Sequence, residues 1–364
     1  MTESERVAEA IAAFKRGEIV VVTDDDDREN EGDLIVAAQH ATPEKLGFIV
    51  RHTSGIVCAP LTREAARRLN LQPMVAENDA PMGTAFTVSV DVRHGLTTGI
   101  SAEERSNTVR ALANGNIGAA DFVRPGHVFP LIAKDGGVLM RSGHTEAAVD
   151  LCRLTGLETV GVLAELVNDD GTVKRGDDVA RFAVEHGLRT VSVADLIAHR
   201  QRSERLVERV AEFPIATHAG PARAFAYRTP FDPTQHLAVV FGDIGDGKRI
   251  PVRLHRESVV DDVFGAKSGL DRVMARLAES GRGIVVYLRE GSVGVAGSNA
   301  RARDALKDGG AASAARQEEW REVGLGAQIL KDLGVKSIRH IASRERRYVG
   351  LDGFGIVIDE TETL

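Results

Sequence analysis

The sequence has very few cysteines. Only two occur among its 364 residues, Cys58 and Cys152. Two thiols cannot form the disulfide framework that holds many small secreted domains together, so we expect a protein of a reducing compartment, the cytoplasm. Each cysteine is better explained as a small buried residue than as a nucleophile, because an unperturbed thiol is mostly protonated at neutral pH.

The sequence also has no long apolar run and no surplus of positive charge. No stretch reaches the ~18 consecutive apolar residues that span a bilayer, and the N-terminal residues 1–6 (MTESER) are too polar for a secretory signal. We therefore expect no membrane partner. The formal net charge is −7, which argues against a nucleic acid held on a broad basic face. An anionic ligand would have to be bound locally.

The chain does contain enough material for two globular domains. Of its 364 residues, 43% are hydrophobic and 27% are charged, and the length exceeds what a single core usually needs. Apolar β-branched runs alternate with helical patterns in both halves, which indicates an α/β architecture. We expect strands at 19–23, 55–59, 86–92, 159–163 and 190–193, helices at 43–51, 63–69, 102–114 and 178–186, and a helical connector from 193 to about 213.

The densest charge comes directly after the first expected strand. Residues 23–33 (TDDDDRENEGD) carry seven carboxylates and one guanidinium. Like charges this close repel one another unless they are solvated, paired or bound to a cation. Hard oxygen ligands favour Mg²⁺, Mn²⁺ or Ca²⁺ over zinc. Two interpretations stay open for this stretch alone, a metal site and a solvated acidic loop.

A second segment, residues 137–146 (GVLMRSGHTE), favours a binding site. A short apolar run leads into RSGHT at 141–145 and then into a helical pattern that Gly156 closes, so we expect a strand, a turn and a helix start. The free N–H groups of a helix start and a forked arginine suit a phosphate. His144 is placed to reach a metal. A structural histidine and an N-capping Thr145 are the alternatives.

Four motifs occur in order along the first half of the chain: DRENEGDL at 27–34, HGLTTGIS at 94–101, GHVFPL at 126–131 and RSGHT at 141–145. Together they make residues 1–203 resemble 3,4-dihydroxy-2-butanone 4-phosphate synthases. Residues 204–364 are similar to GTP cyclohydrolase II. The resemblance implies a synthase-type α/β (α+β) domain followed by a cyclohydrolase II-like α/β domain, the arrangement of bifunctional riboflavin-biosynthesis proteins.

For the first domain, the resemblance implies a lyase that converts D-ribulose 5-phosphate into 3,4-dihydroxy-2-butanone 4-phosphate and formate. The family requires Mg²⁺, with Mn²⁺ as the other candidate. Enolisation of a ketose needs a base beside the carbonyl and a metal that stabilises the enediolate, which explains the residue types. The family forms homodimers through this domain, so a homodimer is implied here. A module that binds sugar phosphates without turnover is the alternative.

The candidate catalytic residues of the family are all present in this sequence. The resemblance implies that Glu29 and His144 hold the metal and that His127 and Glu165 transfer protons, with His127 acting across a subunit boundary. Considered without the family, His127 would be a turn histidine and Glu165 a surface carboxylate. The implied substrate-binding residues are Arg28, Glu29, Asp33, Arg141, Ser142, Gly143, His144, Thr145 and Glu165.

The second half departs from its family at the metal site. GTP cyclohydrolase II holds a zinc ion with three cysteines, yet no cysteine follows Cys152. Ser258 stands where the first thiolate is expected, and AKSGLD at 266–271 replaces the paired cysteines. A hydroxyl is a poor substitute for a thiolate at zinc, so we expect no zinc and an inert structural or regulatory module. The alternative is an enzyme with a rebuilt site that uses His255, Glu257 and Asp261.

Overall fold

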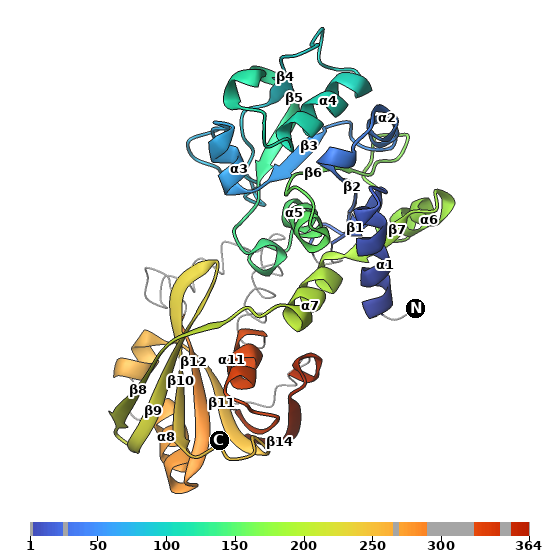
Figure 1. The fold of residues 1–364 in the computed structure, drawn as a ribbon. Helices are drawn as coiled ribbons and strands as arrows, with labels where there is room; N and C mark the ends of the chain where they lie inside the picture. Colours follow the sequence, from blue (N-terminus) through green and yellow to red (C-terminus); the bar gives the residue numbers. More distant parts are fainter. Residues whose placement is uncertain (1–2, 25–27, 265–268, 290–323, 343–350, 364) are drawn as a thin grey trace. The chain divides into compact units, whose positions relative to one another are not determined.

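The computed structural model describes residues 3–24, 28–264, 269–289, 324–342 and 351–363. The chain divides into two compact units, Met1–His199 and Arg200–Leu364. Each unit is built on one seven-stranded sheet with helices packed against it, which confirms the α/β prediction (Figure 1). None of the helices in the described ranges is long and apolar enough to cross a membrane.

The first unit has a mixed sheet with the strand order β4-β5-β3-β6-β2-β1-β7. Its strands are β1 (Val20–Thr23), β2 (Gly32–Ala37), β3 (Cys58–Leu61), β4 (Val90–Val92), β5 (Phe122–Ile132), β6 (Gly161–Glu165) and β7 (Arg189–Ser192). Its helices are α1 (Glu3–Lys15), α2 (Pro43–His52), α3 (Arg63–Arg68), α4 (Ala102–Leu112), α5 (His144–Thr155), α6 (Asp177–Glu185) and α7 (Val193–Ser203), the last of which continues into the second unit.

The central strands β1 and β2 are buried on both faces. Val21 and Leu34 belong to the cluster that α2, α3, α4 and α6 cover, whereas Val20 and Ile35 belong to the cluster that α1 and α5 cover. This division follows from the alternation of side chains along a strand. β1 pairs antiparallel with β2, and the last pair is Thr23 with Gly32. The acidic segment is therefore the loop that joins two central strands.

Two expectations for the chain path are wrong. The apolar run before Arg141 is a 3-10 turn, Gly137–Leu139, because Gly136 and Gly137 have φ values of 89° and 63° and bend the chain. The helical connector stops at Ser203, and an edge strand follows it. Pro214 in that strand lacks an N–H donor, which an edge position tolerates and a helix interior does not.

The two cysteines of the first unit are structural. Both Cys58 and Cys152 are free and buried. Burial raises the pKa of both thiols, that of Cys152 to about 12. A thiol that stays protonated is a weak nucleophile, which confirms the prediction of buried packing residues.

The second unit has a sheet with the order β14-β13-β11-β12-β10-β9-β8. Helices α8 (Gly269–Glu279) and α11 (Gly326–Asp332) contribute to different apolar clusters, α8 through Leu277 and α11 through Ile329. The strands are β8 (Glu208–Thr217), β9 (Gly220–Thr229), β10 (Asp232–Gly242), β11 (Ile250–Arg256), β12 (Arg282–Leu288), β13 (Ser337–Ala342) and β14 (Val357–Thr363). Strand β11 carries His255, and the rest of the segment in which the sequence predicts a lost or rebuilt metal site follows this strand.

Candidate active site

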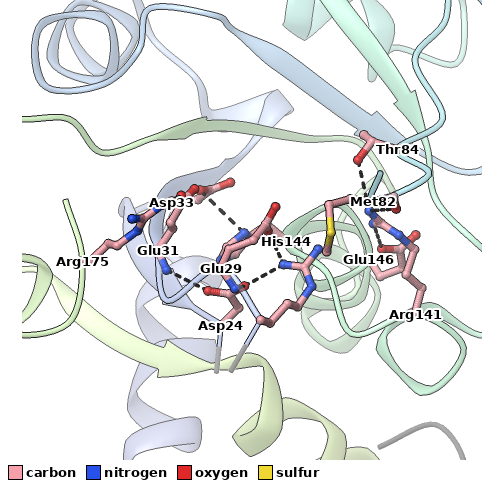
Figure 2. A network of polar contacts seen from close by, with 11 residues as sticks. Asp24, Glu29, Glu31, Asp33, Met82, Thr84, Arg141, His144, Glu146 and Arg175 are labelled. Atoms are coloured by element: carbon pink, nitrogen blue, oxygen red, sulfur yellow. Dashed lines mark hydrogen bonds and ion pairs between the residues drawn. The ribbon is translucent and has the colours of Figure 1, made fainter. Parts of the chain in front are cut away.

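One carboxylate, Asp24, organises the described part of the acidic loop (Figure 2). Its Oδ1 accepts the N–H of Glu31 at 2.8 Å, and its Oδ2 accepts the N–H of Glu29 at 3.1 Å. Arg28 Nη1 donates to the same Oδ2 at 2.7 Å and also pairs with the Glu29 carboxylate. The side chains of Asp24 and Arg28 are only 1% and 3% exposed. The loop is thus held by buried donors, and solvation alone does not account for it.

Several carboxylates converge beside this loop. Asp33 lies on β2 directly opposite Glu165 on β6. Burial raises the pKa of Asp33 well above its usual value, and the charges of Glu165 and Glu29 raise it further. Burial also raises the pKa of Glu29, an effect that the guanidinium of Arg28 opposes. A bound cation would lower both pKa values by favouring the charged carboxylates.

His144 begins helix α5 and faces Asp33 (Figure 2). The distance from His144 Nδ1 to Asp33 Oδ1 is 3.7 Å. Burial lowers the pKa of His144 to about 4, so the imidazole is neutral near pH 7, the form that binds metals. Two buried atoms here have no hydrogen-bond partner, His144 Nε2 and Asp33 Oδ1. Because buried polar atoms are normally paired, these two fit a cation.

The donor set favours a hard cation that keeps water. Within the described residues, no group of three or more His, Cys, Asp or Glu side chains is arranged to hold a metal ion by itself. Mg²⁺ commonly retains several waters and takes one or two carboxylates from the protein. An ion held by Glu29 and His144, with Asp33 beside them, would therefore keep most of its coordination positions for water or substrate.

Arg141 is fixed on the other side of the same group (Figure 2). Its Nη1 pairs with Glu146 Oε2 at 2.7 Å, and its Nη2 donates to Met82 O and Thr84 Oγ1 at 3.1 Å each. Glu146 is 1% exposed, and its other oxygen accepts the N–H of Lys134 at 3.0 Å. A forked donor held this firmly next to a helix start is suited to a phosphate group.

The turn before α5 is shaped by Gly143. A Cβ at this position would lie 2.5 Å from Arg141 Nη1, so only glycine leaves room for the guanidinium. Gly143 is also the N-cap of α5, which rules out Thr145 as the capping residue. Ser142 and Thr145 are 3% and 5% exposed, so the side chains on both sides of Gly143 and His144 are buried.

Glu165 ends strand β6 and is held from the segment that follows α2. Ser54 Oγ donates to Glu165 Oε2 at 2.9 Å, and the N–H of Ser54 donates to the carbonyl of Glu165 at 2.8 Å. On the opposite side of the loop, Arg175 Nη2 pairs with Glu31 at 2.9 Å. The structure therefore brings together all the predicted site residues from 28 to 33, from 141 to 145, and Glu165.

His127 lies apart from this group. It is on β5, and strands β3 and β6 separate β5 from β2, which carries Asp33. Three strand spacings amount to about 14 Å. The partner of His127 is Asp91 on β4: His127 Nδ1 lies 2.7 Å from Asp91 Oδ2. Within one chain, His127 therefore lies well away from Asp33.

In the second unit, the residues around His255 and Ser258 form a polar network. His255 Nε2 lies 2.9 Å from Asp262 Oδ1, while Tyr287 Oη donates to Asp262 Oδ2 at 2.8 Å and the N–H of Ser258 donates to it at 2.9 Å. Glu257 accepts from Arg289 Nε at 3.3 Å. Residues 265–268 and the side chain of Asp261 lie outside the described residues.

Asp24, Glu146 and Asp91 are among the residues of these networks that the sequence analysis did not single out. Asp24 lies inside the acidic run, and Glu146 lies at the end of the segment 137–146. Sequence spacing does not reveal which carboxylate in these segments is buried. For Asp91 a signal was available, because an acid between Val90 and Val92 interrupts an otherwise apolar strand. A buried carboxylate needs a partner, and here the partner is His127.

Comparisons with known proteins find matches over nearly the whole chain. The family profile of 3,4-dihydroxy-2-butanone 4-phosphate synthase matches residues 8–199, and that of GTP cyclohydrolase II matches residues 208–363. A relative in Arabidopsis thaliana, the bifunctional riboflavin biosynthesis protein RIBA 1 (chloroplastic), is 46% identical over 367 residues, which cover 97% of this chain and 67% of the relative.

Two solved structures are also similar. RibBX, a two domain 3,4-dihydroxy-2-butanone 4-phosphate synthase from A. baumannii, is 37% identical, with a TM-score of 0.81 and 98% of both chains covered. A 3,4-dihydroxy-2-butanone 4-phosphate synthase in complex with two magnesium ions is 47% identical, with a TM-score of 0.53, and covers 54% of this chain and 97% of that one.

Proposed function

The chain belongs to the 3,4-dihydroxy-2-butanone 4-phosphate synthase family of riboflavin biosynthesis, with a GTP cyclohydrolase II-type second domain, and on this basis we propose the details of its reaction. Residues 1–203 convert D-ribulose 5-phosphate into 3,4-dihydroxy-2-butanone 4-phosphate and formate, with Mg²⁺ or Mn²⁺ held by Glu29 and His144. The observation that carries the metal site is the pair of buried, unpartnered atoms His144 Nε2 and Asp33 Oδ1. The related synthase solved with two magnesium ions supports it.

The substrate is held at its two ends. Arg141, fixed by Glu146, binds the phosphate together with the N–H groups at the start of α5. Arg28, Asp33 and the residues of the turn before α5 orient the carbonyl end. A divalent ion bound there supplies charge stabilisation for the enediolate that forms when the ketose loses a proton.

Two residues move protons in this scheme. Glu165, oriented by Ser54, lies at the end of β6 beside Asp33, within the group that binds the reacting end of the sugar. His127 lies about three strand spacings away in the same chain, so it reaches the substrate of a second subunit. The side chain of His127 is 41% exposed, as expected of a residue that serves a neighbouring site.

We propose a homodimer through the first domain for the same reason. Large apolar side chains are exposed on segments that adjoin His127 in the sheet or in sequence. Ile56 is 50% exposed and precedes β3, the strand beside β5; Ile100 is 55% exposed and follows Gly99, which lies against His127. Exposed apolar residues around a distant catalytic group are typical of an interface that completes the site. The two free, buried cysteines are consistent with the cytoplasm.

For residues 204–364 we propose a structural or regulatory module without cyclohydrolase activity. No cysteine follows Cys152, so the thiolate ligands of the family are missing. Both oxygens of Asp262 already accept hydrogen bonds, and this leaves the segment around His255 poorly suited to a new ligand set. The two-domain synthase from A. baumannii supports this assignment, whereas the relative named bifunctional supports the alternative of an active second site.

The metal site is tested by Glu29→Ala and His144→Ala in the full-length protein. Each variant removes one proposed ligand, so formate release from ribulose 5-phosphate should fall at least about 10³-fold, and Mn²⁺ binding measured by electron paramagnetic resonance should weaken at least tenfold. Arg181→Gln, at a side chain that is 77% exposed, is the matched surface control. This variant should leave formate release and Mn²⁺ binding unchanged. Near-normal turnover in both ligand variants would refute the assignment.

A further inference from the structure

The pairing of strand β5 with β4 is irregular where His127 lies. β4 pairs with β5 through Val90 and Val128 and then through Asp91 and Val123, so β5 has extra residues between the two pairs. Such a bulge bends a strand and re-aims its side chains, and bulges are frequent next to active sites. Within it, the N–H of His127 donates to Asp91 Oδ1 at 2.9 Å. The carboxylate of Asp91 thus accepts the hydrogen bond that a backbone carbonyl would accept in a regular strand pair.

The same carboxylate also holds the imidazole. Asp91 Oδ2 lies 2.7 Å from His127 Nδ1. The side chain of Asp91 is 4% exposed and that of His127 is 41% exposed, so the anchor is buried and the ring extends toward solvent. An ionised carboxylate accepts hydrogen bonds only, so Nδ1 carries the hydrogen and Nε2 keeps its lone pair. Nε2 is the nitrogen left to exchange a proton.

Two neighbours, Gly99 and Arg105, lie close to the pair of Asp91 and His127. Gly99 has a φ of 86°, and a Cβ there would lie 2.2 Å from Asp91 Oδ2 and 2.6 Å from His127 Nδ1. Arg105 is 5% exposed and donates to the carbonyl of Gly55 at 3.0 Å. Burial lowers the pKa of Arg105, and the charge on Asp91 opposes this effect, so the guanidinium lies within electrostatic reach of the carboxylate.

We propose that Asp91 is the positioning residue of His127: it selects the tautomer with hydrogen on Nδ1, aims Nε2 at the substrate and stabilises the imidazolium when His127 takes a proton. Asp91 does not itself touch the substrate. The inference rests on the proposed proton-transfer role of His127. It predicts that the charge of Asp91, and not merely its volume, is needed for turnover.

The test is Asp91→Asn in the full-length protein. Asparagine has nearly the same shape and retains an oxygen acceptor for the N–H of His127, but its amide donates to Nδ1 and thereby selects the opposite tautomer. We expect kcat for formate release to fall roughly 10²-fold while KM changes less than about threefold, because the loss affects proton transfer and not binding. Steady-state kinetics with ribulose 5-phosphate separate the effect on kcat from the effect on KM.

The matched control is Asp121→Asn. Asp121 Oδ1 lies 3.0 Å from His94 Nε2, but that pair is exposed, with side chains 32% and 71% accessible. An exposed pair contributes little to structure, so kcat should stay within about twofold of the unchanged protein. A fall equal to that of Asp91→Asn would mean that any histidine–carboxylate pair in this region matters equally, which contradicts the proposal.

A second readout does not depend on activity. In ¹⁵N-histidine-labelled protein at about pH 8.5, where a free imidazole is neutral, the two ring nitrogens of His127 give distinct chemical shifts. We expect hydrogen on Nδ1 in the unchanged protein and on Nε2 in Asp91→Asn. Hydrogen on Nε2 in the unchanged protein overturns the proposal even if the variant fails to fold.

Different results would contradict the proposed function and the positioning role of Asp91. An unchanged protein that releases no formate from ribulose 5-phosphate contradicts the proposed function. An active protein whose Asp91→Asn variant retains full kcat contradicts the positioning role alone.

Discussion

The most informative single substitution in the acidic loop is Asp24→Asn. Asp24 accepts the N–H groups of Glu29 and Glu31 and the guanidinium of Arg28, and its side chain is 1% exposed. Asparagine can replace one of these acceptors but not the negative charge. Among the residues that the structure describes, Arg28, 3% exposed, then keeps only the Glu29 carboxylate as an anionic partner.

The size of the effect follows from burial. Removing one partner of a buried ion pair costs about 3–5 kcal/mol, and since asparagine keeps the shape and one acceptor, we expect a loss of about 2–4 kcal/mol in the stability of the first unit. In a unit of this size, that corresponds to a fall in Tm of roughly 5–12 °C. Metal affinity should fall roughly tenfold, because Glu29 loses the hydrogen bond that positions its backbone.

The control for this substitution is Asp178→Asn. Asp178 also pairs with an arginine, Arg181, but the two side chains are 42% and 77% exposed. An exposed pair contributes about 0–1 kcal/mol, so its Tm should barely change. Differential scanning calorimetry gives the Tm values, and titration with Mn²⁺ gives the affinities. If Asp24→Asn and Asp178→Asn behave alike, then Asp24 does not organise the loop.

Three further predictions concern other contacts. Ser54→Ala removes the hydroxyl bond to Glu165, so we expect kcat to fall about threefold to tenfold with an unchanged Tm; an unchanged kcat would show that Glu165 needs no such support. Asp262→Asn breaks the network of the second unit and should lower the Tm of that unit by several degrees without affecting formate release from ribulose 5-phosphate; a loss of that release would reveal coupling between the units. Burial lowers the pKa of His340 from 6.5 to about 4, so the unfolded chain takes up this proton first, and the stability that the neutral side chain provides is full above about pH 6.5 and lost toward pH 4, by at most about 3 kcal/mol. Urea unfolding of the second unit at pH 7 and pH 5 measures the loss, and His340→Asn should remove this part of the pH dependence.

Local patterns in the sequence were enough to predict much of the architecture. Thr42, Thr62 and Ser101 each accept a hydrogen bond at the start of the helix they precede, and Gly156 ends α5 with a φ of 69°. Such signals depend on neighbours in the chain, so they can be recognised without a structure. The edge strand β8 was misjudged as a helix because its exposed, charged positions resemble a solvated helical face, and its pairing with β9 is a long-range choice.

The candidate site was predictable to the extent that motifs carry it. The acidic run and the turn before α5 together contain most of the proposed metal and phosphate ligands. The supporting contacts depend on the fold. Nothing in the sequence spacing indicates that Asp91 on β4 meets His127 on β5, because a bulge sets their register. The separation of His127 from Asp33 likewise follows from strand order, which local patterns do not encode.

The most direct test of the account is formate release by the full-length protein in two parallel reactions, each supplied with Mg²⁺ and Zn²⁺. One reaction receives ribulose 5-phosphate and the other GTP, and since both chemistries expel formate, one detector measures both. The account predicts formate from ribulose 5-phosphate only, abolished by a chelator and restored by Mg²⁺. Formate from GTP would contradict the assignment of an inactive second unit, and no formate from ribulose 5-phosphate would contradict the proposed reaction of the first.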